Sequence, residues 1–202
     1  NNALDRMILD GGFFPTNFRS GWLNTHTALQ GWIEKWFLAD FSSNWSTPWT
    51  PYHPSPTNYA VPGSMNHWIA RCDGGPSQAG VNSAFAEAAS TGLPVIYCWY
   101  GHDRENMSNY INNLQTYLGV AAGSTGVQFK YATSKEAMQG VMGTTDTTPP
   151  DLVIAQGTGD TFNVTSNEPV WNNAPYVTAR YLLPESRFTS ALDGCVARGE
   201  PL

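Results

Sequence analysis

Charged side chains are scarce in this 202-residue sequence: Lys, Arg, Asp and Glu together make up 13% of it, and the net charge is −6 at pH 7. This negative charge argues against a nucleic-acid-binding surface, because such surfaces attract phosphates with clustered lysines and arginines. No apolar run approaches the roughly 20 residues that a transmembrane helix needs, so we expect no membrane span. The sequence also lacks a signal peptide and begins with Asn1, as expected of a mature form or a piece of a longer protein.

Only three cysteines are present, and their number alone predicts little. Cys98 lies within an apolar run, where we expect a buried and unreactive thiol. Cys72 and Cys195 lie in loop-like surroundings and can pair with each other if the protein is secreted. Few lysines, together with many Asn, Ser, Thr, Trp and Tyr residues, favour an extracellular or secreted protein that handles carbohydrate.

Motifs of several common enzyme classes are also missing. The sequence contains neither a Gly-rich phosphate-binding loop nor a Gly-x-Ser-x-Gly segment, so a nucleotide-binding enzyme and an α/β-hydrolase are unsupported. The four histidines show no paired spacing such as i, i+4, so no metal site is predicted within the chain. Most glutamates fall on predicted helices rather than at strand ends, which makes a two-carboxylate glycosidase the weaker hypothesis.

The sequence does contain an alternation of apolar runs and helical patterns. Residues 93–100 form a short run rich in β-branched and aromatic side chains, which predicts a buried central strand of a parallel sheet. A helical pattern follows at 107–118. This α/β order predicts parallel strands joined by crossover helices. Further helices are predicted at 3–9, 25–36, 78–91 and 133–142, and further strands at 13–22, 37–41 and 127–132.

The pattern changes after a Thr- and Pro-rich linker at residues 144–150. Residues 152–155 and 161–165, around a Gly-rich turn, predict a β-hairpin, and residues 176–183 predict a third strand. The sequence therefore predicts two parts. Residues 1–143 form an α/β part, and residues 151–202 form a small antiparallel β module that packs on it because so small a core is hard to stabilise alone.

Aromatic residues concentrate in the segment 42–76, which we expect to be a long ordered loop. Flat aromatic rings suit the apolar faces of sugars, so this loop is a candidate glycan-binding surface. The alternative is that the same rings plug one end of a barrel. The residues predicted to bind substrate are Trp22, Trp45, Trp49, Tyr52, His53 and Tyr59.

Three polar residues lie at predicted strand ends: Arg19, Asp40 and His102. The carboxyl ends of parallel strands are where α/β proteins place their active sites. Histidine exchanges protons near neutral pH, a guanidinium can orient a carboxylate, and a carboxylate can hold a histidine in one tautomer. We therefore predict that the three converge as a catalytic group. The alternative is an ion pair between Arg19 and Asp40, with His102 making only a loop hydrogen bond.

These strand ends resemble motifs of the polysaccharide deacetylases, the NodB-homology or carbohydrate esterase family 4 domains. The segment FRSGW at 18–22 resembles the family's third motif, FLADF at 37–41 its fourth, and VIYCWYGHD at 95–103 its fifth. The resemblance covers residues 1–143 and implies the C-terminal half of an irregular (β/α) barrel. It implies that His102 protonates the departing amine, that Arg19 orients the catalytic base and that Asp40 tunes the histidine. The third motif lacks its usual proline, and the fourth lacks its usual Asp-Trp ending.

The family's Asp-Asp and His-x-x-x-His motifs have no counterpart in the sequence. The resemblance thus implies a divalent metal, Zn²⁺ or another, whose ligands are not in this chain, and another chain or segment that completes the barrel. Two functions are expected. One is metal-assisted removal of acyl groups from a polysaccharide, and the other is a non-catalytic extracellular module that binds glycans or builds an assembly.

Overall fold

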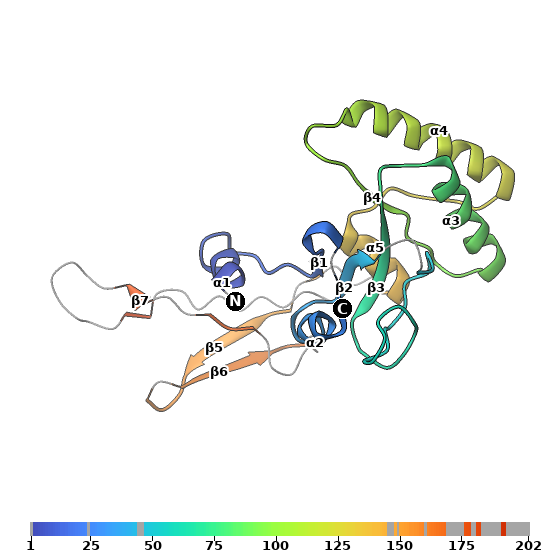
Figure 1. The fold of residues 1–202 in the computed structure, drawn as a ribbon. Coiled ribbons are helices and arrows are strands. Elements are labelled where there is room, and N and C mark those ends of the chain that lie inside the picture. Colours follow the sequence, from blue (N-terminus) through green and yellow to red (C-terminus); the bar gives the residue numbers. More distant parts are fainter. Residues whose placement is uncertain are drawn as a thin grey trace. The chain divides into compact units, whose positions relative to one another are not determined.

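Two units make up the chain in the computed structural model (Figure 1): one is Asn17–Thr144, and the other combines Asn1–Thr16 with Thr145–Leu202. The structure describes residues 2–23, 25–43, 47–144, 148, 150–159, 161–168, 176–178, 181–182 and 191–192. Within this described part, no helix is long and apolar enough to cross a membrane. Each unit is described separately.

The larger unit is built on a curled parallel sheet whose strands follow one another in space as they do in the sequence. Helix α2 (Thr27–Trp36) connects the first two strands, and α3 (Gln78–Thr91) connects the last two. This is the topology of half a (β/α) barrel, so the predicted α/β class is confirmed for this unit. The strands are β1 (Asn17–Phe18), β2 (Ala39–Ser43), β3 (Trp68–Gly74) and β4 (Cys98–Tyr100).

The helices of this unit begin and end at local sequence signals. Thr133 and Glu136 form a capping box at the start of α5 (Ser134–Met142). Side-chain oxygens likewise accept backbone N–H groups at the starts of α3 and α4 (Met107–Thr125). Each of these three helices ends at a glycine with φ between 67° and 74°, where a side chain would be strained. The three glycines are Gly92, Gly126 and Gly143.

The two faces of the sheet pack against different helices. On one face, Phe41, Cys72 and Tyr100 lie in a cluster with Met138 of α5, which is fully buried. On the other face, Trp99 packs in a cluster with α3 and α4, which lie side by side (Figure 1). Successive strand residues point to opposite faces, and this alternation decides which polar side chains can meet.

The strand prediction was wrong in three places. Residues 68–74, expected in the aromatic loop, form β3 inside the sheet, where Arg71 and Asp73 interrupt the apolar pattern that would have marked a buried strand. The strand predicted as central is represented by β4, which lies at the edge of the four-stranded sheet with half-buried side chains. Residues 127–132 form no strand, because strand formation depends on a partner as well as on composition.

Cys72 and Cys98 form a disulfide between β3 and β4. The two residues are register partners, with Cα atoms 4.4 Å apart. The expected free thiol at Cys98 and the expected pair of Cys72 with Cys195 are therefore both wrong, and Cys195 lies outside the described residues. The prediction failed because it placed Cys72 in a loop, so nothing in the sequence brought it beside Cys98.

The smaller unit contains the predicted hairpin, formed by antiparallel β5 (Leu152–Gln156) and β6 (Phe162–Ser166). Within the expected third strand, 176–183, the described residues 181–182 form β7 (Tyr181–Leu182), which pairs with β8 (Ala191–Leu192). Most of the predicted linker, 144–150, lies outside the described residues.

Helix α1 (Asn2–Leu9) belongs to this smaller unit rather than to the α/β part in which it was expected. The Tyr176 hydroxyl donates a hydrogen bond to the Asp5 carboxylate at 2.8 Å, and the rings of Phe14 and Tyr176 lie 5.7 Å apart. Burial, together with this hydrogen bond and the charge of Asp5, raises the pKa of Tyr176 to about 12. These contacts join residues far apart in the sequence, and no local sequence pattern predicts them.

Candidate functional site

The carboxyl ends of β1 and β4 bring a guanidinium, a phenol ring and an imidazole together. Arg19 directly follows β1, and its guanidinium carbon lies 3.9 Å from the centroid of the Tyr100 ring. His102 lies just beyond β4, with its ring edge-on to Tyr100 at a centroid distance of 6.1 Å. Since β1 and β4 are the outer strands of the sheet, this contact depends on the curl of the sheet. We call Arg19, Tyr100 and His102 the rim cluster.

The polar groups of the rim cluster are open to a ligand. Arg19 and His102 are exposed, and the described part of the chain supplies neither of their side chains with a hydrogen bond or an ion pair. A cation–π contact at an exposed site is worth about 0.5–1 kcal/mol. It restrains the guanidinium while leaving the N–H groups at its edge free to donate. The backbone N–H of His102 donates to the Glu105 carboxylate at 2.6 Å, which restrains the loop beyond β4.

A glycine makes room for the Tyr100 ring. Gly74 ends β3 opposite Tyr100, and a Cβ atom built on Gly74 would lie 3.0 Å from the tyrosine hydroxyl oxygen. The next residue, Gly75, donates its N–H to the Tyr100 carbonyl at 2.8 Å. The sequence analysis missed Tyr100. The available signal was its position two residues before His102, which places both on one face of the strand and its extension.

Asp40 does not join the rim cluster, so the predicted convergence of three residues is contradicted for this one. Strand β2 continues past Asp40 to Ser43, so Asp40 is not its end. Its neighbour Phe41 lies in the same cluster as Tyr100, and alternation turns Asp40 to the opposite face. There its carboxylate accepts hydrogen bonds from the Gln30 amide at 2.6 Å and from the Ser42 backbone N–H at 2.8 Å.

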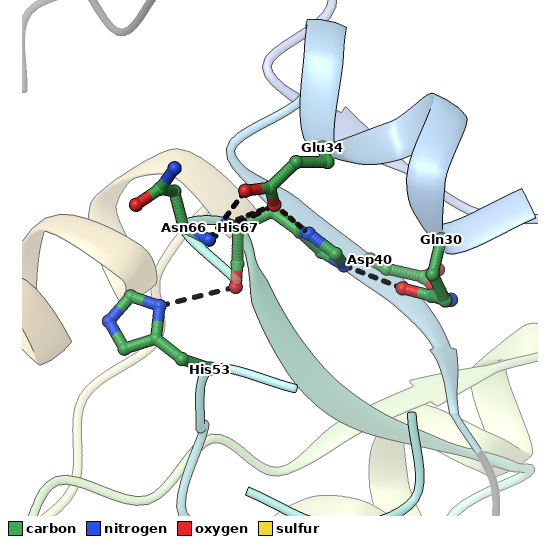
Figure 2. Close-up of polar contacts among 6 residues, drawn as sticks. All are labelled: Gln30, Glu34, Asp40, His53, Asn66 and His67. Atoms are coloured by element: carbon green, nitrogen blue, oxygen red, sulfur yellow. Dashed lines mark hydrogen bonds and ion pairs between the residues drawn. The ribbon is translucent and has the colours of Figure 1, made fainter. Parts of the chain in front are cut away.

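Asp40 forms one end of a buried chain of hydrogen bonds, shown in Figure 2. Gln30 Oε1 lies 2.5 Å from His67 Nε2, and His67 Nδ1 lies 2.6 Å from Glu34 Oε2. Gln30, Asp40 and His67 are at most 1% exposed. This chain of hydrogen bonds connects α2 to β2 and to the start of β3. This is the amino end of the sheet, where buried polar groups support the fold rather than the chemistry of α/β barrels.

Both ring nitrogens of His67 have partners in this chain of hydrogen bonds. One faces the Gln30 amide oxygen and the other faces the Glu34 carboxylate. Glu34 also accepts from the backbone N–H groups of Asn66 and His67. The Gln30 amide nitrogen donates to Asp40, so Gln30 joins His67 to the Asp40 carboxylate.

The same hydrogen bonds control the acidity of Glu34. Burial raises its pKa, but the hydrogen bonds from the His67 side chain and from the backbone of His67 and Asn66 outweigh burial. The pKa of Glu34 therefore lies below its ordinary value. Hydrogen bonds donated to a carboxylate favour its ionised form.

The Trp49 ring is packed inside the protein, at 1% exposure, and is not offered to a glycan in this structure. Its indole N–H donates to the Ser83 hydroxyl at 3.2 Å, and the Arg71 guanidinium lies 3.9 Å from its ring centroid. The Glu87 carboxylate accepts the backbone N–H groups of Trp49 and Thr50. Burial raises the pKa of Glu87, but these hydrogen bonds outweigh it and the net shift is downward.

Tyr52 is also buried, at 8% exposure, and its hydroxyl donates to the Tyr59 carbonyl at 2.9 Å. Burial, with smaller contributions from Tyr59 and Asp40, raises the pKa of Tyr52 to about 12. His53 is half-buried and its ring lies 3.9 Å from the Trp68 ring. For Trp49 and Tyr52, the structure thus fits the alternative in which the rings act as a plug. Tyr59 is half-buried, and Trp45 lies outside the described residues.

Trp22 differs from the buried Trp49 and Tyr52, because it is 100% exposed. It lies three residues after Arg19 on the connection from β1 to α2. Trp22 and the following Leu23 both have positive φ, 57° and 53°, a conformation that non-glycine residues rarely adopt. Backbone strain of this kind gathers at ligand-binding and active sites.

A separate cavity of about 520 Å³ lies between the segment leading into β4 and residues 127–132. Its walls are mainly apolar and come from α3, α4 and α5. Glu136 is one of the few charged residues that line it, and its carboxylate already completes the α5 capping box. The cavity therefore lacks the convergent polar groups that the rim cluster has.

No group of three or more His, Cys, Asp and Glu side chains able to hold a metal occurs in the described part of the chain. The resemblance itself places the ligands of the divalent metal outside this chain, so no chemical step is assigned through a metal. Comparisons with protein-family models, with curated proteins and with solved structures found no match. The resemblance to polysaccharide deacetylases is therefore a hypothesis that depends on the motifs and on the rim cluster.

Proposed function

We propose that the larger unit is a carbohydrate-active domain of the polysaccharide deacetylase type, with its acid–base chemistry at the rim cluster. One observation carries the proposal: Arg19 and His102, which follow the first and last strands of the sheet, meet around Tyr100. These are the positions that the third and fifth family motifs would occupy. The Cys72–Cys98 disulfide supports a secreted protein, because disulfides persist in oxidising compartments.

In this proposal His102 is the catalytic acid. When the bond from the acyl carbon to the amine or alcohol breaks, the leaving group takes a proton from the imidazolium. The attacking water adds its oxygen to the acyl carbon to form the carboxylic acid, and the proton that it loses restores the imidazolium. Arg19 binds and positions an anionic oxygen near the reacting carbon. Asp40 has no role at the rim, because it lies on the other face of the sheet and helps to connect α2 to β2.

A second candidate is a glycan-binding module without catalysis. The complete exposure of Trp22 favours it, because a flat indole ring that is open to water is available to stack on a sugar ring. In this case Arg19 and His102 contribute hydrogen bonds to the sugar but do not transfer protons to a leaving group.

Acetate release by the full 202-residue chain tests both candidates. The substrates are N-acetylglucosamine oligomers and acetylated xylo-oligosaccharides, with and without added Zn²⁺. His102→Ala should lower the rate of release by roughly 10²–10⁴-fold while binding is retained, because only proton transfer is lost. The control is His26→Asn, which replaces an exposed histidine that caps α2 with another good capping residue.

The outcomes separate the candidates. Release that is unchanged in His102→Ala removes His102 from the mechanism. Binding of oligosaccharide without release by the wild type contradicts the deacetylase and supports the binding module. If the wild type neither binds the oligosaccharides nor releases acetate, both candidates are contradicted.

A further inference from the structure

We propose that the rim cluster recognises an acidic glycan, with Arg19 binding the carboxylate of a uronic acid and Trp22 stacking on a sugar ring. This inference names the substrate class of the rim cluster and therefore rests on the proposed function.

The Arg19 guanidinium is the first feature that points to an anionic ligand. Arg6 and Arg71 pair with Asp10 and Asp73, whereas Arg19 has no carboxylate partner in the described part of the chain. The chain as a whole carries a net charge of −6, so acidic groups are not scarce. A guanidinium presents N–H donors in a planar fork that matches a carboxylate with two parallel hydrogen bonds. Arg19 is therefore equipped for an anion that the described residues do not supply.

The second argument is the way in which Arg19 is held. Its guanidinium lies over the Tyr100 ring at 3.9 Å, and Tyr100 in turn packs against the backbone of Gly74. Stacking on Tyr100 restrains the plane of the guanidinium without using its N–H donors. A side chain restrained before binding loses less freedom when the ligand arrives, so each hydrogen bond to the ligand contributes more to affinity.

Trp22 supports the inference in a way that does not depend on charge. Its ring is fully exposed, and the backbone of Trp22 and Leu23 has positive φ. A strained connection that holds an indole in water three residues from Arg19 is expected where a ligand covers the ring. The flat face of an indole suits the apolar face of a pyranose. A sugar that carries its own carboxylate, a uronic acid, supplies both the ring and the anion.

Calorimetric titration of the full chain with tri-galacturonate and with its methyl ester tests the inference. The ester keeps the sugar and removes the charge. The wild type should bind tri-galacturonate at least about ten-fold more tightly than the ester at low salt, as expected for charge-assisted hydrogen bonds. Added NaCl should narrow this difference, because salt screens exposed charges.

Three variants assign the contacts. Arg19→Gln should bind acid and ester alike, and Arg19→Lys, which keeps the charge without the fork, should retain only part of the preference. Trp22→Ala should weaken the binding of both. Arg6→Gln, which removes an exposed arginine from α1, is the control and should keep the full preference.

Equal binding of acid and ester by the wild type overturns the inference, as does a full preference in Arg19→Gln or no binding of either sugar. None of these results decides the proposed function, which is judged separately by acetate release from the neutral substrates. A wild type that releases no acetate from the neutral substrates but still prefers tri-galacturonate to its methyl ester would contradict catalysis. Acidic-glycan recognition would remain in place.

Discussion

At the scale of single residues, the alternation of side chains along a strand separates the predicted site residues. Arg19 and His102 were predicted to converge, and the structure brings both to Tyr100, while their catalytic role stays a prediction. Asp40 was predicted with them, but it lies on the opposite face of the sheet. A strand end cannot be located to within one residue from sequence, and an error of one residue turns a side chain to the wrong face.

Gly74→Ala tests how closely Tyr100 is fitted against β3. The new Cβ would lie 3.0 Å from the tyrosine hydroxyl, so we expect a loss of about 1 kcal/mol in the free energy of unfolding, typical of mild overpacking. Tyr100→Phe should recover part of this loss, because it removes the contacting oxygen. Urea unfolding of the single and double variants measures the coupling.

Gly119→Ala is the matched control. Gly119 lies within α4, and a Cβ atom there would meet nothing within 4 Å, so the helix should gain rather than lose stability. A Gly74→Ala variant as stable as the wild type would contradict the close fit.

At the scale of elements, the buried chain from Glu34 through His67 and Gln30 to Asp40 connects α2 with two strands. Its members are separated by up to 37 residues in sequence, and none was predicted to be part of such a chain. His67 lies in the segment 42–76, which was predicted to be a loop. Its role depends on β3, which begins at the next residue and places it beside α2.

Glu34→Gln tests this connection through its pH dependence. The folded-state pKa of Glu34 is lowered, so its contribution to stability is present above the unfolded-state value of about 4.5 and is lost as the pH falls through the lower folded value. At pH 7 the variant should be less stable by about 1–3 kcal/mol, because the hydrogen bonds from His67 and from the Asn66 backbone lose their ionised acceptor.

This difference should shrink as the pH falls through the folded-state pKa of Glu34, since the wild-type carboxylate then becomes protonated and uncharged, like the glutamine amide of the variant. Chemical unfolding between pH 3 and pH 7 measures it, with the exposed Asp103→Asn as control. A stability difference that is independent of pH would rule out an ionised Glu34 paired with His67.

At the scale of the whole molecule, the chain forms two units whose boundaries do not follow the linear order. Residues 1–16 belong with 145–202, whereas the sequence analysis placed them with the α/β part. The larger unit carries the rim cluster, the buried chain and the disulfide. Each of these depends on contacts between strands that are distant in sequence.

The Cys72–Cys98 disulfide should stabilise the larger unit. It joins residues 26 apart, and a loop of this size corresponds to about 3–4 kcal/mol from restriction of the unfolded chain. Reduction, or the paired substitution Cys72→Ala with Cys98→Ala, should lower the free energy of unfolding by about this amount. Mapping of peptides from the unreduced protein should find Cys72 bound to Cys98. A peptide that joins Cys72 to Cys195 would contradict the structure.

The sequence by itself determined the three helices between residues 77 and 143 and most of their ends, together with the hairpin after the linker; the helix predicted at 107–118 continues to Thr125. Caps, glycine stops and turn residues act within a few positions, so their effects can be read locally. Only the tertiary structure decided that residues 68–74 form a strand, that Cys72 meets Cys98, and that Tyr100 rather than Asp40 lies between Arg19 and His102. The hydrogen-bond partners of a strand lie elsewhere in the chain, and which face a side chain occupies depends on a register that those partners set.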